Sequence, residues 1–176
     1  MKKLVMVGMI LMAGSMVYAT DTQVNTRLTG GVTSSGEYSD EATSVGGDIN
    51  ILRSSNGKFY YGVELGATNN DYSDDDESYN TVHVGLVGKY YFNDNLYAQG
   101  SVGVIKGDGD FYGGLYSHDV SSPYISTELG YQFDNNVSVF GGMMIYEIEE
   151  KYDGIIIQTV EEETVVKGYI GVGYTF

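Results

Sequence analysis

Residues 167–176, KGYIGVGYTF, alternate in character from one position to the next. Ile170, Val172, Tyr174 and Phe176 share one face of an extended chain, and the residues between them are mostly glycine or threonine. A period of two indicates a β-strand with one apolar face. Residues at the end of a chain are usually polar and frayed, so a strand that stops on a large aromatic side chain predicts that this face is buried or recognised.

The same alternation recurs in seven further segments, which makes eight predicted strands. The seven span residues 24–32, 45–51, 59–65, 82–92, 96–104, 125–133 and 137–145. Short turns rich in Asn, Asp or Gly follow the second, fourth and sixth strands, and long polar segments follow the first, third, fifth and seventh. The pattern predicts an all-β, eight-stranded antiparallel up-and-down barrel that crosses a membrane, with short periplasmic turns and long extracellular loops.

The position of the charged residues favours a membrane barrel over a soluble sandwich or lipocalin, which would also show alternation. No charged residue lies on the apolar face of any predicted strand. The small and polar face carries all of them: Arg27, Asp48, Glu64, His83, Lys89, Glu128 and Lys167. Aromatic residues gather on the apolar face beside the short turns, as in the girdle at a membrane interface.

The inward set sums to zero charge if His83 is neutral, and charges inside a narrow barrel need partners. We therefore predict a salt-bridge network in the lumen. An eight-stranded barrel is just wide enough for side chains to fill. Val87, Ile105, Phe140 and Met144 also point inward and are interpreted as plugging. The alternative to a structural network is a gated ion path or a proton relay. The corresponding alternative function is a narrow porin-like channel for ions or small solutes.

The N-terminal residues 1–19, MKKLVMVGMILMAGSMVYA, have the organisation of a cleaved secretory signal peptide, with a lysine pair, an apolar stretch and a small residue at the cut. This leaves residues 20–176 as one exported barrel domain. No later apolar run approaches the ~18 residues of a membrane helix. The chain has no cysteine, so disulfides and thiolate chemistry are excluded.

The long polar connections carry 18 of the chain's 24 acidic residues, and the formal net charge is −15. This argues against a nucleic-acid partner. The acidic segments are interpreted as a solvated surface, as an adhesion surface for a cationic or Ca²⁺-bridged partner, or as a divalent-cation site. The candidate cation ligands in DYSDDDES are Asp71, Asp74, Asp75, Asp76 and Glu77, which lack the spacing of an EF-hand. No cofactor is predicted.

Gly171, Tyr174 and Phe176 match the C-terminal recognition signal of bacterial outer-membrane barrels. With the strand count and the turn asymmetry, the chain resembles the small eight-stranded barrels: OmpX/Ail-like proteins, opacity proteins and the membrane domain of OmpA. The resemblance implies residence in the outer membrane, contact with its lipid and lipopolysaccharide, recognition by the barrel assembly machinery, and a structural, adhesion or interaction role. It departs from members whose basic loops bind heparin-like polyanions.

Some outer-membrane barrels are hydrolases or acyltransferases, so the nucleophile and base residues matter. The chain has two histidines: His83 points into the lumen, and His118 lies in a predicted loop three residues from Ser121. A lipid A deacylase of similar size places its His and Ser two apart on a strand. This spacing is not matched, and the sequence predicts a protein that is not an enzyme.

Overall fold

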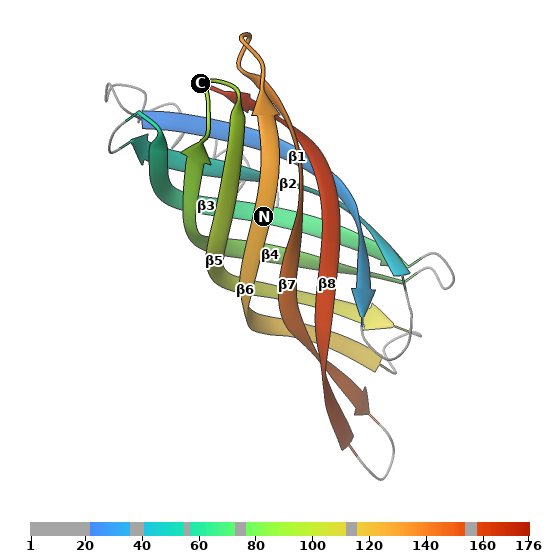
Figure 1. The fold of residues 1–176 in the computed structure, drawn as a ribbon. Coiled ribbons are helices and arrows are strands. Elements are labelled where there is room, and N and C mark those ends of the chain that lie inside the picture. Colours follow the sequence, from blue (N-terminus) through green and yellow to red (C-terminus); the bar gives the residue numbers. More distant parts are fainter. Residues whose placement is uncertain (1–21, 36–40, 55–56, 73–76, 112–115, 154–157) are drawn as a thin grey trace.

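The computed structural model describes residues 22–35, 41–54, 57–72, 77–111, 116–153 and 158–176, which form a closed barrel of eight antiparallel strands in chain order (Figure 1). The strands are β1 (Thr22–Ser35), β2 (Glu41–Ser54), β3 (Phe59–Tyr72), β4 (Glu77–Tyr91), β5 (Leu96–Phe111), β6 (Tyr116–Gln132), β7 (Val137–Asp153) and β8 (Gln158–Thr175). The predicted fold class is confirmed. Within these ranges no helix is long and apolar enough to span a membrane. The predicted signal peptide lies outside the described residues.

Closure depends on β1, which pairs with both β2 and β8. Arg27 lies opposite Asp48 of β2 on one side and opposite Gly173 of β8 on the other. The amide of Phe176 donates to the carbonyl oxygen of Val24 at 2.9 Å, which continues this seam beyond the strand. Each strand therefore has two neighbours through the wall, and the barrel has no open edge there.

The predicted boundaries of the long loops are wrong, because the strands continue well into them. β7 runs to Asp153 and β8 starts at Gln158, whereas the alternation predicted a seventh strand that ends at residue 145, followed by a long polar loop. Lys106, His118 and Ser121 likewise lie in strands. Apolar alternation marks only the part of a strand that faces lipid, but the ladder is made by backbone groups and does not end where the alternation ends.

The short turns have the local chemistry that their sequences predict. Gly57 and Asn136 adopt positive φ angles of 76° and 67°, a conformation that glycine and asparagine tolerate best. In the turn after β4, the Asn93 side-chain oxygen accepts from the amides of Asn95 at 3.0 Å and Leu96 at 2.7 Å. These turns place three hairpin ends and Phe176 at one end of the barrel.

The outer wall is apolar over its middle part. Leu28, Val45, Leu86 and Ile170 are each at least 66% exposed, which is unusual for large aliphatic side chains in contact with water. Between these residues and the short turns lies an exposed belt of four aromatic pairs in edge or stacked contact: Phe59–Tyr61, Tyr90–Phe92, Tyr131–Phe133 and Tyr174–Phe176. This is the surface that a lipid bilayer covers, with the belt at one interface.

We expect Ile170→Arg to reduce the free energy of unfolding in lipid by about 2–4 kcal/mol, because Ile170 lies near the middle of the apolar band. Leu96→Arg, beside the short turn after β4, should cost about 0–1 kcal/mol at the interface. Urea unfolding of both variants in vesicles measures the difference. Equal losses at the two positions would contradict the placement of the bilayer.

Glycines in the wall provide room for the aromatic rings of the lumen. A Cβ on Gly103 would lie 2.8 Å from Cε1 of Tyr124, and one on Gly85 would lie 3.1 Å from Cζ of the same ring. The Tyr97 ring covers Gly130 in the same way. An eight-stranded barrel cannot hold a large side chain at every inward position, so aromatic residues alternate with glycines across neighbouring strands.

Candidate functional site

The lumen holds all seven charged or titratable residues that the sequence placed on the inward face. None exceeds 8% exposure: Arg27, Asp48, Glu64, His83, Lys89, Glu128 and Lys167. They come from six strands, and the alternation of each strand is what brings them to one interior. The register, which the sequence does not give, decides which of them touch.

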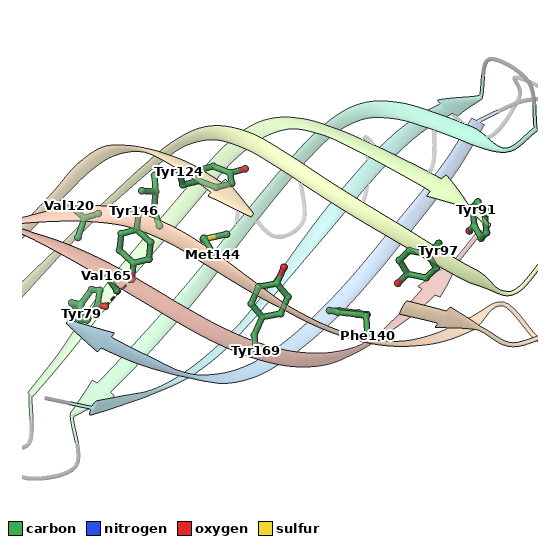
Figure 2. Packing of buried hydrophobic residues seen from close by; sticks show 11 residues of the cluster. Tyr79, Tyr91, Tyr97, Val120, Tyr124, Phe140, Met144, Tyr146, Val165 and Tyr169 are labelled. Carbon is green, nitrogen blue, oxygen red and sulfur yellow. Dashed lines mark hydrogen bonds between the residues drawn. The ribbon is translucent and has the colours of Figure 1, made fainter. Parts of the chain in front are cut away.

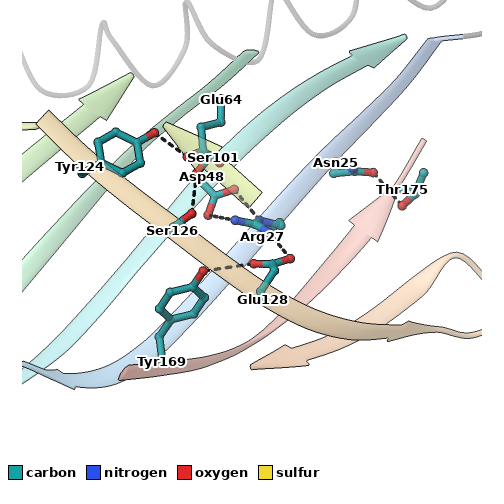
Figure 3. Close-up of polar contacts among 10 residues, drawn as sticks. All are labelled: Asn25, Arg27, Asp48, Glu64, Ser101, Tyr124, Ser126, Glu128, Tyr169 and Thr175. Atoms are coloured by element: carbon teal, nitrogen blue, oxygen red, sulfur yellow. Dashed lines mark hydrogen bonds and ion pairs between the residues drawn. The ribbon is translucent and has the colours of Figure 1, made fainter. Parts of the chain in front are cut away.

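Arg27 is the centre of the interior charge cluster (Figure 3). Its Nε and Nη2 atoms donate to the two carboxylate oxygens of Asp48 at 2.5 and 3.0 Å, and Nη1 donates to Glu128 at 2.7 Å. The Tyr169 hydroxyl donates to the second oxygen of Glu128 at 3.3 Å. The guanidinium also lies 4.7 Å from the centre of the Phe140 ring. A bidentate guanidinium–carboxylate pair inside a barrel fixes both side chains in one orientation.

Glu64 is satisfied by a neutral partner rather than by a cation. The Tyr124 hydroxyl donates to Glu64 at 2.6 Å, and the Tyr124 ring stands edge-on to the His83 imidazole, with centroids 5.4 Å apart. The imidazole lies over Gly66, where a Cβ would be 2.6 Å from Nε2. The sequence did not lead us to predict Tyr124 as a site residue, although its inward position on β6 could have indicated it.

The two buried lysines are held without a carboxylate within 4.0 Å in the part of the chain that the structure describes. Lys167 donates to the hydroxyl of Thr68 at 3.0 Å. The ammonium of Lys89 lies 3.9 Å from the centre of the Tyr97 ring and 4.8 Å from that of Tyr91. The lumen thus combines ion pairs around Arg27 with hydroxyl and cation–π contacts for the lysines.

Buried tyrosines lie toward both ends of the barrel, and Figure 2 shows Tyr79 and Tyr146 well separated from Tyr91 and Tyr97. Near one end the hydroxyls of Tyr79 and Tyr146 are 3.0 Å apart, beside Val120 and Val165. Near the other end Tyr91 and Tyr97 are in contact, and Tyr91 donates to Gln132 at 2.5 Å. The four inward side chains that we interpreted as plugging the lumen are all buried: Val87, Ile105, Phe140 and Met144.

A cavity of about 20 Å³ remains beside the cluster, lined in part by Glu64, Thr68, His83 and Lys167. A space of this size holds about one water molecule. The arrangement is that of a packed interior, with buried charges held in fixed positions.

The strand extension above the barrel is the second candidate site. β1 pairs with β8 only as far as Ser35 opposite Val165, whereas β7 and β8 remain paired to Asp153 opposite Gln158. We call residues 147–153 and 158–164 the β7–β8 extension; Figure 1 shows it projecting beyond the end of β1. Among the described residues, none pairs with the β1-facing side of residues 158–164, and these seven residues form the edge of β8 in that part of the chain. This edge has the sequence QTVEEET.

The other predicted sites lie apart from the lumen. Tyr174 and Phe176 are exposed on the outer wall, with ring centroids 4.8 Å apart, and a Cβ on Gly171 would meet the Phe140 ring. Their role in assembly stays a prediction. Asp71 is exposed on β3, and the side chains of Asp74, Asp75, Asp76 and Glu77 lie outside the described part of the structure. Within that part no group of three or more His, Cys, Asp or Glu residues is placed to hold a metal.

In the described part of the structure, the candidate nucleophile and base residues do not lie together. Ser121 is exposed, and Ser122 is engaged by backbone groups of β6 and β7. The side chain of His118 lies outside the described part. His83 is enclosed between Tyr124 and the wall.

Comparison with known proteins finds similarity in structure only. No family model matches the chain, and no curated protein matches it in sequence. Neisserial surface protein A (NspA) is similar with a TM-score of 0.54 and 16% identity, over 88% of this chain and 97% of that one. Ail, the attachment invasion locus protein of Yersinia pestis, gives 0.54 and 14%, over 89% and 98%. The outer membrane enzyme PagL gives 0.50 and 14%, over 82% and 97%.

At these identities the similarity concerns the fold. Because one of these neighbours is an enzyme, the fold does not decide between catalysis and binding. The structural similarity and the closed ladder of eight strands in this chain agree on one fold. The chain has the fold of the small eight-stranded outer-membrane β-barrels.

Proposed function

We propose that this protein is a non-enzymatic surface protein of the outer membrane, and that its β7–β8 extension binds an extended, cationic segment of a partner protein. The observation that carries the proposal is that, within the described ranges, residues 158–164 of β8 have no ladder partner on the side that faces β1. An exposed edge offers backbone donors and acceptors in the geometry that a further strand needs.

Charge supports a cationic partner. Glu161, Glu162 and Glu163 are consecutive on the edge strand, and the first two lie opposite Glu150 and Glu149 of β7 in the ladder. The whole chain carries a formal charge of −15. Opposite charge on a partner speeds its encounter with such a surface and discriminates against acidic segments. Ail has been solved in complex with the heparin analogue sucrose octasulfate; an acidic extension disfavours a ligand of that kind here.

The packed lumen supports binding over conduction. The interior charge cluster and the tyrosines along the barrel are buried in the described part of the lumen, and close packing of this kind favours binding over conduction. The proposal includes a signal peptide at residues 1–19, assembly through the strand ending in Tyr174 and Phe176, and contact with lipopolysaccharide on the outer leaflet.

The test is binding of a fluorescent peptide of alternating Lys and Val to the protein in nanodiscs at ~0.15 M salt. A matched variant replaces residues 148–163 with Asn-Gly, which joins Glu147 to its ladder partner Thr164 by a two-residue turn. We expect this variant to lose affinity by about tenfold or more. The variant D94N/D134N, which removes acidic residues from the exposed turns at the other end, should bind as the wild type does.

Peptide variants separate strand pairing from simple charge attraction. Proline at alternate valine positions keeps the charge but removes donors that a ladder requires. Loss of binding by this peptide supports edge pairing. Equal binding by the proline peptide, or no effect of replacing the extension, would refute the proposed site.

A further inference from the structure

The β6–β7 ladder contains a break where the extension leaves the barrel. The two strands pair from Tyr116 opposite Tyr152 to Asp119 opposite Glu149, and pairing resumes at Tyr124 opposite Tyr146. Between these points, four residues of β6 face two of β7. Among the described strand pairs, this is where the register shifts. Surplus residues on one strand form a β-bulge, which bends that strand and increases its twist.

The bulge has its own hydrogen bonding, centred on Ser122. The Ser122 hydroxyl accepts from the amide of Glu147 at 3.0 Å and donates to the carbonyl oxygen of Pro123 at 3.1 Å. Pro123 has no amide hydrogen to give to a ladder. A side chain that is only 9% exposed thus supplies an acceptor to β7 at the point where the regular pairing is interrupted.

Both neighbouring ladders are continuous at this level. β5 pairs with β6 through Ile105 opposite Ser122, and β7 pairs with β8 through Glu147 opposite Thr164, each without a shift. The surplus is therefore absorbed at the β6–β7 seam alone. Glu147 is ten residues above Val137, where β7 starts; a strand needs about 9–11 residues to cross a bilayer. The bulge lies where the wall passes from lipid to water.

We infer that Ser122 is a positioning residue: its hydrogen bond to β7 fixes the direction in which the β7–β8 extension leaves the barrel. Below the bulge, β7 is held by the packed lumen through Met144 and Tyr146. Above it, the extension pairs with β6 on one side through the shifted register, and on the other side β8 has no ladder partner among the described residues. The inference deepens the proposed function, because the direction of the extension determines where its edge is presented.

The absence of cysteine allows a direct test, because two introduced cysteines can be labelled uniquely. Nitroxide labels at Thr159, on the extension, and at Asp94, in an exposed turn at the far end, report the direction of the extension as a distance distribution by electron spin resonance. Thr159 and Asp94 are substituted by cysteine in every variant, and the heat-dependent gel shift confirms that each barrel has folded.

We expect Ser122→Ala and Ser122→Val to shift or broaden the distribution, because both lack the hydroxyl, and Ser122→Thr to restore it. Ser101→Ala is the matched control, since Ser101 is buried in a regular ladder and its hydroxyl lies 2.5 Å from that of Ser126. It should leave the distribution unchanged. An unchanged distribution in both Ser122→Ala and Ser122→Val would overturn the inference.

Peptide binding by the same variants keeps this inference separate from the proposed function. If the wild type binds the Lys-Val peptide, Ser122→Ala should weaken binding by about tenfold, the equivalent of one lost ladder hydrogen bond. If the wild type does not bind, the proposed function fails, and the distance distributions still decide the role of Ser122.

Discussion

Replacing Arg27 with methionine should reduce the free energy of unfolding by about 3–5 kcal/mol, because the carboxylates of Asp48 and Glu128 would remain buried without their cation. Both carboxylates are within 3.0 Å of the guanidinium, and neither exceeds 8% exposure. Methionine is an unbranched, neutral side chain of similar volume, so the loss reports charge more than volume. Reversible urea unfolding in vesicles, followed by tyrosine fluorescence, measures it.

The control variant also removes the two carboxylates that Arg27→Met would leave without a cation. The triple variant Arg27→Met, Asp48→Asn, Glu128→Gln should regain most of the lost stability, because replacing a buried ionic group with neutral groups of similar shape is close to neutral. A triple variant as unstable as Arg27→Met alone would show that Arg27 acts through packing. A single variant as stable as the wild type would show that its ion pairs contribute nothing to folding.

Gly103→Ala should reduce the free energy of unfolding by about 3 kcal/mol or more. Two effects contribute, because the added methyl group overpacks the lumen and its accommodation breaks a buried hydrogen bond. A Cβ at Gly103 would lie 2.5 Å from the Cα of Gly85 and 2.8 Å from the Tyr124 ring, so neither the wall nor the ring can avoid it. If Tyr124 is displaced, its hydrogen bond to Glu64 breaks and a buried carboxylate loses its partner. The fraction that migrates as folded protein on unboiled gels, followed against urea, provides the measurement.

Gly168→Ala is the matched control, because a Cβ at this position of β8 meets nothing within 4 Å. It makes the same chemical change on the outward face and should leave the unfolding midpoint nearly unchanged. Equal losses in the two variants would mean that the cost does not come from contact with the lumen. Only a loss confined to Gly103 supports the ring-over-glycine packing.

The alternation of residues was enough to predict eight strands and the face on which each side chain lies. Glu64 and Lys167 are far apart in the sequence, yet the period of two correctly placed both inside. The ends of the strands could not be predicted, because above the apolar band the ladder of β7 and β8 is independent of hydrophobic pattern. The β7–β8 extension was therefore not predicted, because its residues were interpreted as a loop.

Partners within the lumen could not be predicted, because they depend on register and on side-chain length. The sequence gives no reason for Glu64 to choose Tyr124, or for Lys89 to lie against Tyr97 and Tyr91, when oppositely charged residues share the same face. The glycines opposite the rings carried a signal: an inward glycine marks a place where a neighbour across the wall is large. Reading that signal requires knowing that Gly85 and Gly103 lie opposite each other.

The seam between β1 and β8 has a consequence for the order in which the molecule folds. Across this seam the hydroxyl of Thr175 donates to Asn25 at 2.8 Å, and the two residues are 150 positions apart in the chain. The other neighbouring strands are consecutive hairpins, which close over short loops and can form early. We therefore expect pairing of β1 with β8 to come last and to be the slow step. Until then both strands would expose unpaired backbone groups, which the assembling membrane must shelter.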